Sequence, residues 1–85
     1  MPHYYFDVWE QGKVARDDDG LELESLEAAE QEARRGAADM GRDSLPMGRC
    51  SEVRVQVRNE RGEPLLSVAV SMRVRREALV LAYAR

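Results

Sequence analysis

Aromatic and basic side chains alternate with apolar ones along two segments of this 85-residue chain, and they are its best candidates for chemistry. In residues 3–9, HYYFDVW, every second side chain points the same way if the segment is a strand. In residues 50–59, CSEVRVQVRN, arginines alternate with valines in the same manner. Aromatic rings beside arginines on an exposed sheet can stack on bases and pair with phosphates. The candidate partner-binding residues on this face are Tyr5, Asp7, Trp9, Arg54, Arg58, Arg73 and Arg75.

The same residues also have a purely structural interpretation. Tyr5 and Trp9 can pack beneath the C-terminal segment or in a dimer interface, and Asp7 can pair with an arginine. The net charge is −3, and the chain lacks the glycine-aromatic signature of RNA-binding sheets, so both features count against nucleic acid. The structural interpretation is therefore preferred, and nucleic acid remains the alternative partner.

The acidic stretch at residues 17–20, DDDG, raises the question of a calcium site. An EF-hand loop needs acids at alternate positions, a glycine at the sixth and a glutamate at the twelfth. Placing Gly20 sixth puts Ala15 first and Leu26 twelfth, so the spacing does not fit. We expect a solvated turn and no metal site.

The chain has one cysteine, Cys50, and one histidine, His3. These counts exclude an internal disulfide and a Cys₄ or Cys₂His₂ zinc site. A Cys50–His3 nucleophile pair would also need an orienting group and a cleft. The sequence contains no Gly-rich phosphate loop, nucleophile elbow or HExxH motif. We therefore predict no catalytic residue, no cofactor and no enzymatic activity.

A single long helical pattern, residues 25–41, must support the strands that carry these side chains. Ser25 is the expected N-cap, and Gly41 is the expected residue after the helix. The face expected to cover the sheet recurs at three- and four-residue steps and comprises Leu26, Ala29, Ala33, Gly36/Ala37 and Met40. Before the helix, residues 1–17 are predicted to form a hairpin that turns at Gly12.

A second hairpin is predicted at residues 50–75, after a connecting loop at 42–49. Residues 64–75 alternate throughout, and we expect this longest strand to be central. Its apolar side comprises Leu66, Val68, Val70, Met72 and Val74. Period-two alternation predicts that only one sheet face is buried in the monomer. The predicted fold class is α+β in the order ββαββ, a four-stranded antiparallel sheet with one helix packed on one face.

A short C-terminal extension, residues 76–85, ends the chain with the sequence REALVLAYAR. Its pattern suits either a strand continuation or a short helix. Seven consecutive apolar residues, 78–84, are expected to cover the open sheet face or to meet another subunit. The candidate dimer contacts are Leu79, Val80, Leu81 and Tyr83.

Length and charge set the broad class. The 85 residues make one domain, 1–85, which buries only about 60–65% of its unfolded surface. Residues 1–48 carry five basic and twelve acidic side chains, whereas residues 49–85 carry eight arginines and four glutamates. We expect the two halves to attract each other within one fold.

Since no segment resembles a signal peptide or a membrane span, we expect a cytoplasmic protein without a membrane partner.

Three motifs together resemble a family of small bacterial proteins of unknown function. They are the opening MPHYYFDV, the acidic turn before a Leu-Glu-Ala-Ala helix, and the hairpin EVRVQVRNERGEPLL. Members open with Met-Pro-x-Tyr-Phe-Phe-Asp and close with V-x-V-R-D-E-x-G-x-P-V-L, in which Asn59 here replaces the aspartate. The resemblance covers about residues 1–75 and implies the ββαββ order and a bacterial setting, but no activity.

These observations lead to two functional hypotheses. The first is a non-catalytic protein-interaction module that forms a homodimer through the open sheet face and the apolar C-terminal extension. The alternative is a nucleic-acid or anion-binding regulator that uses the arginines and aromatic rings of the same face. An enzyme is disfavoured because a one-helix domain of this size has little material for a concave pocket.

Overall fold

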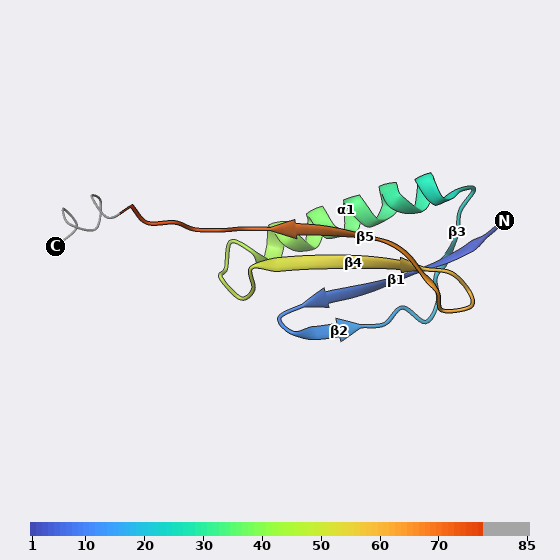
Figure 1. Ribbon diagram of the computed structural model, residues 1–85, viewed down its shortest axis with the longest axis horizontal. Helices are drawn as coiled ribbons and strands as arrows, with labels where there is room; N and C mark the ends of the chain where they lie inside the picture. Colours follow the sequence, from blue (N-terminus) through green and yellow to red (C-terminus); the bar gives the residue numbers. More distant parts are fainter. Residues whose placement is uncertain (78–85) are drawn as a thin grey trace.

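The fold is a twisted antiparallel sheet with one helix across one face (Figure 1). The computed structural model describes residues 1–77. The elements are β1 (His3–Glu10), β2 (Lys13–Ala15), β3 (Leu21–Glu22), α1 (Leu26–Ser44), β4 (Glu52–Arg58) and β5 (Pro64–Ser71). The strand order is β2-β1-β4-β5, and β3 also pairs with β1. The predicted α+β class and ββαββ order are confirmed, with the two-residue β3 as an addition.

The first hairpin turns at Gln11 and Gly12, as the glycine indicated. Both residues have positive φ, 54° and 72°, which is the geometry of a two-residue type I′ turn. This turn suits the right-handed twist of the flanking strands. The return strand is short, however, and ends at Ala15 rather than continuing to Asp17.

The helix begins where the sequence predicted, because the Ser25 hydroxyl accepts a hydrogen bond from the Ala28 N–H at 3.1 Å. Its buried stripe follows a four-residue repeat of small side chains, which lets the backbone approach the sheet closely. The stripe packs on the valines of β4 and on Tyr4. The buried members of α1 are Ala29, Ala33, Ala37 and Gly41. Leu26, expected on this face, is instead 39% exposed at the first turn.

The helix is longer than predicted, and Gly41 does not end it. Gly41 lies inside α1 where the helix passes close to β5, and an added Cβ would be 3.2 Å from Val70 Cγ1. A glycine is needed here for space rather than for positive φ. The helix continues to Ser44, and the next residue, Leu45, is buried in the core instead of lying in a loop.

The last strand lies at the edge of the sheet, so the expectation that it is central was wrong. The central strands are β1 and β4, which pair with each other from Tyr5↔Arg58 to Glu10↔Val53. Alternation over many residues showed that the segment is a strand, but it carries no information on how many neighbours a strand has.

The chain after β5 continues in the direction of the strand, beyond the end of the sheet (Figure 1). Residues 72–77 are exposed, and the pairing with β4 ends near Ser71, short of the predicted Arg75. The predicted apolar run and its candidate dimer contacts Leu79, Val80, Leu81 and Tyr83 lie outside the described residues. Among residues 1–77, no helix combines the length and apolarity that a membrane span requires.

Two helical glycines provide a test of this close approach. Gly36→Ala should stabilise the protein by about 0.5–1 kcal/mol, because its Cβ meets only Met40 Cε at 3.8 Å. Gly41→Val should destabilise it by about 1–3 kcal/mol through overpacking against Val70. Urea unfolding followed by circular dichroism measures both changes. A Gly41→Val protein as stable as wild type would contradict the observed packing.

Candidate functional site

The sheet face opposite α1 carries the side chains that the sequence singled out. We call it the open face, since no described element covers it. Strand alternation and the pairing registers assign its members from four strands. The open face comprises His3, Tyr5, Asp7 and Trp9 of β1, Val14 of β2, Glu52, Arg54, Gln56 and Arg58 of β4, and Ser67, Ala69 and Ser71 of β5.

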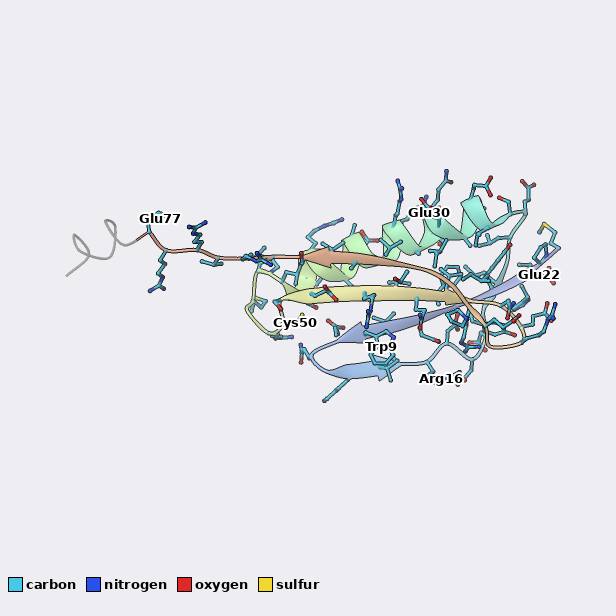
Figure 2. All side chains as sticks on the ribbon, viewed as in Figure 1. Trp9, Arg16, Glu22, Glu30, Cys50 and Glu77 are labelled. Carbon is cyan, nitrogen blue, oxygen red and sulfur yellow. The ribbon has the colours of Figure 1, made fainter. Side chains whose placement is uncertain are left out.

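Trp9 and Arg54 are its most accessible pair. They lie directly opposite each other on β1 and β4, and the Arg54 guanidinium carbon is 5.5 Å from the centre of the Trp9 ring. Figure 2 shows Trp9 over β1 and β2, where Val14 is its cross-strand neighbour. Trp9 is 40% exposed and Val14 is 44% exposed. This corner therefore presents an aromatic ring, an aliphatic side chain and a cation to solvent.

Arg58 has a different environment, although it belongs to the same alternating pattern. Its side chain is only 14% exposed and donates from Nε to Asp7 Oδ2 at 2.8 Å. It also donates from Nη2 to the Asp17 carbonyl oxygen at 2.8 Å and stacks on the Tyr5 ring at 4.6 Å. Arg58 and Asp7 are thus joined to each other inside the face rather than offered to a partner.

Asp7 and Asp17 tie the acidic loop to the first strand. Asp7 Oδ1 accepts the Asp17 N–H at 2.9 Å. The Asp17 carboxylate in turn accepts three backbone N–H groups, those of Phe6, Asp19 and Gly20. Asp17 therefore organises a turn through side chain-to-backbone hydrogen bonds, which is the usual role of aspartate in loops. Asp18 and Asp19 are exposed, so the expected solvated turn describes them but not Asp17.

Gly20 closes this loop against β1. Its φ is 67°, and a Cβ there would lie 2.6 Å from the Tyr4 carbonyl oxygen. The chain can therefore pass next to β1 only with glycine at this position. The DDDG sequence contained this signal, since Asp and Gly three residues apart are typical of such turns. The long-range hydrogen bond that the Phe6 N–H donates to the Asp17 carboxylate had no signal in the sequence.

The hydrogen bonds set the protonation of both carboxyl groups. Burial opposes ionisation of Asp7, but the hydrogen bond from Arg58, the Asp17 N–H and the nearby positive charge outweigh it. The pKa of Asp7 therefore lies below its ordinary value. Burial likewise opposes ionisation of Asp17, and the N–H groups that it accepts hold its pKa below the ordinary value. Both groups are carboxylates in the folded protein at neutral pH.

The remaining candidates are separated from this network. Arg73 and Arg75 follow β5 on the exposed segment 72–77, where Arg75 lies 3.8 Å from Glu77. His3 bonds through Nε2 to the Asp19 carbonyl oxygen at 2.7 Å. Cys50 precedes β4, and the antiparallel register sets it at the opposite end of the sheet from His3. These two residues therefore cannot form a nucleophile pair.

Among residues 1–77, no three His, Cys, Asp or Glu side chains gather closely enough to hold a metal ion.

A shallow apolar groove of about 250 Å³ lies on the other side of the sheet, between α1 and β1. The sequence pattern gave no signal for this groove, because the exposed Leu21 and the half-buried Met40 come together only in the fold. Its lining residues are Phe6, Val8, Leu21, Glu32, Gly36, Met40 and Val55.

Comparison with known protein families places most of the chain in a family. The family model described as a domain of unknown function (DUF6894) matches residues 3–71, which contain every helix and strand of the fold. The expected resemblance to a family of unknown function agrees with this match. Neither the curated proteins nor the solved structures include a match to the chain.

The Asp7–Arg58 pair provides a stability test. Arg58→Ala should lower the free energy of unfolding at pH 7 by about 3 kcal/mol, because it leaves a buried carboxylate without its cation. Arg61→Ala is the matched control, since that side chain is 85% exposed and should matter by less than about 0.5 kcal/mol. Equal stability of the two variants would contradict the structural role of Arg58.

A second readout of the same variants is the pH dependence. The pKa of Asp7 is lower in the folded than in the unfolded protein, so its contribution is present above the unfolded pKa, about 4. That contribution is lost as pH falls through the lowered value. The difference between wild type and Arg58→Ala should therefore shrink as urea unfolding is repeated from pH 6 downward.

Proposed function

Because the chain belongs to the DUF6894 family of domains of unknown function, its surface is the guide to its role, and we propose that it is a non-catalytic protein-interaction module that forms a homodimer. The single observation that carries this proposal is the open face, which no described element covers. A sheet face that no helix or strand covers, with an accessible tryptophan at one corner, is suited to contact with another protein.

The chemistry of the accessible corner supports a protein partner. Trp and Arg are the residue types most enriched among the energetically dominant positions of protein interfaces. Trp9 and Arg54 are already stacked, so little side-chain freedom remains to be lost on binding. The small side chains of β5, Ser67, Ala69 and Ser71, leave the neighbouring part of the face flat.

The polar groups of the face favour binding over catalysis. Every buried side-chain nitrogen or oxygen in residues 1–77 has a hydrogen-bond partner. The carboxylates with lowered pKa, Asp7 and Asp17, hold backbone groups and Arg58 rather than facing a cleft. A general acid or base needs to reach a substrate proton, and these groups are already engaged.

Size gives a further reason to expect self-association. An 85-residue chain buries a smaller fraction of its surface than a larger domain, so its stability margin is small. Association with a second copy adds buried apolar surface without adding chain. The apolar residues 78–84 would contribute to the same association.

The homodimer is tested by size-exclusion chromatography with light scattering. We expect a mass of twice 9.7 kDa at micromolar concentration, changing to the mass of one chain on dilution. Removal of residues 80–85 should weaken the dimer, and Trp9→Ala should leave the fold intact in circular dichroism. A monomer at all concentrations, unchanged by the truncation, would refute the homodimer.

The alternative function is recognition of nucleic acid or another anion, and one observation favours it. Arg54 is exposed over the face of Trp9, so a base could stack on the ring while the guanidinium meets a phosphate. Arg73 and Arg75 continue the same side of the β5 alternation. The engagement of Arg58 by Asp7 and the net charge of −3 weaken this alternative.

Trp9 is the only tryptophan, so its fluorescence reports on this surface directly. If bases stack on it, single-stranded oligonucleotides at low salt should quench the emission, and Arg54→Ala should weaken binding and reduce its salt dependence. Absence of any change in emission or anisotropy at low salt would exclude the nucleic-acid alternative.

A further inference from the structure

The outer edge of β5 is unpaired within the described residues, and it is built for pairing. Met72 N–H donates to the Ser51 carbonyl oxygen at 2.9 Å, so these two residues form a hydrogen-bonded pair. Because hydrogen-bonded and non-bonded pairs alternate, Val70, Val68 and Leu66 also direct their backbone groups to β4. Ser67, Ala69 and Ser71 therefore direct their N–H and C=O groups outward.

This edge lacks the features that usually block pairing with another chain. Natural edge strands are guarded by charges, by proline, by bulges or by short length. Residues 65–72, LLSVAVSM, carry no charge, and the proline and the bulge lie at the start of the strand, near Pro64. The opposite edge is different, because β2 and β3 are three and two residues long and Lys13 begins β2.

The segment after β5 indicates what kind of strand would fit against this edge, because it carries exposed apolar side chains. Residues 72–77 leave the sheet in the direction of β5 (Figure 1), and their apolar residues remain in phase with the core side of that strand. Met72 is 43% exposed and Val74 is 79% exposed, although Leu66, Val68 and Val70 in the same phase pack under α1. Two apolar residues at strand spacing, Met72 and Val74, thus keep exposed side chains at the end of the sheet.

We propose that β5 pairs with β5 of a second copy in an antiparallel manner about a two-fold axis at Val70, so that two sheets become one. This inference rests on the proposed homodimer and sets its interface at the edge of β5 rather than on the open face, which stays available to another protein. In this register each residue lies opposite the partner residue whose number, added to its own, gives 140. Val70 meets the partner's Val70, Val68 meets the partner's Met72, and Leu66 meets the partner's Val74.

Other registers fit less well. The outward-facing backbone groups belong to odd-numbered residues of β5. Two odd-numbered residues can lie opposite each other only in a register whose residue numbers add to an even sum, so only such registers let these groups bond to each other. A shift toward the C-terminus, to a sum of 142, sets Arg76 opposite Leu66. A shift the other way, to 138, moves Val74 past Leu66 to Pro64. At 140 both exposed apolar residues gain apolar neighbours, and on the other face Ser67 and Ala69 meet Arg73 and Ser71.

The helices are compatible with this arrangement. α1 packs on both β4 and β5, and Gly41 lies against Val70. With strands about 4.8 Å apart, a continuous sheet would set the two helix axes about 10 Å apart, close to the spacing of packed helices. The two open faces would then lie side by side on one surface, with both Trp9–Arg54 corners accessible.

Cysteine scanning tests the register. In a Cys50→Ser background, single cysteines replace Val68, Ala69, Val70 and Ser71, and mild oxidation is followed by non-reducing electrophoresis. Val70→Cys should cross-link fastest, because facing Cα atoms in a non-hydrogen-bonded pair are about 4.5 Å apart, within disulfide range. The like positions of the other three variants are farther apart than the ~7 Å that a disulfide tolerates. Fastest cross-linking at another position would overturn the register.

A matched pair of charged variants tests the interface itself. Val74→Lys should weaken the dimer about tenfold or more in light scattering, since each copy sets a lysine against Leu66. Leu21→Lys changes an exposed leucine of β3, which pairs with β1 away from β5 and lies off the open face, and should leave dimerisation unchanged. A dimer unaffected by Val74→Lys overturns the β5 pairing while the proposed homodimer stands. A wild-type monomer at every concentration overturns both.

Discussion

The close approach of α1 to β4 and β5 is the constraint on which the rest of this small domain depends. Three alanines and Gly41 form the buried stripe of the helix, and the valines of β4 lie beneath them. Because these side chains are small, the 19-residue helix lies close against β4 and β5 and covers that part of one sheet face. It cannot reach the other face. The polar character of that face, and its tightly bonded Asp7–Arg58 pair, are consequences of this one-sided core.

The open face combines two kinds of position that the sequence pattern treats alike. Arg58 and Arg54 both alternate with valines on β4, yet Arg58 is enclosed by Asp7, Tyr5 and the Asp17 carbonyl, whereas Arg54 is exposed over Trp9. The difference arises from the acidic loop, which folds over one end of β1 and brings Asp17 to Arg58. One end of the face is therefore structural. The other end is the part available to a partner.

Much of the fold follows from the sequence alone. The hairpin turn at Gln11-Gly12, the Ser25 cap, the valine row of β4 and the order of elements were all predicted correctly, because each depends on residues close together in the chain. The errors concern longer-range facts. Gly41 was expected to end the helix, but it serves as a contact with Val70, and a pattern cannot distinguish a glycine needed for φ from one needed for space. Leu45 was assigned to a loop for a similar reason, since its burial depends on the path of the chain after the helix.

The sequence by itself determined the periodicities, the turn chemistry and the set of side chains on each side of each strand, because backbone geometry sets these locally. It identified Trp9, Arg54 and Arg58 as belonging to one surface. Only the tertiary structure decided that β5 is an edge strand, that Asp17 bonds to β1 and that Arg58 is engaged while Arg54 is accessible. The physical reason is that strand order and side-chain pairing depend on contacts between distant segments, and alternation along one strand is the same whatever lies beside it.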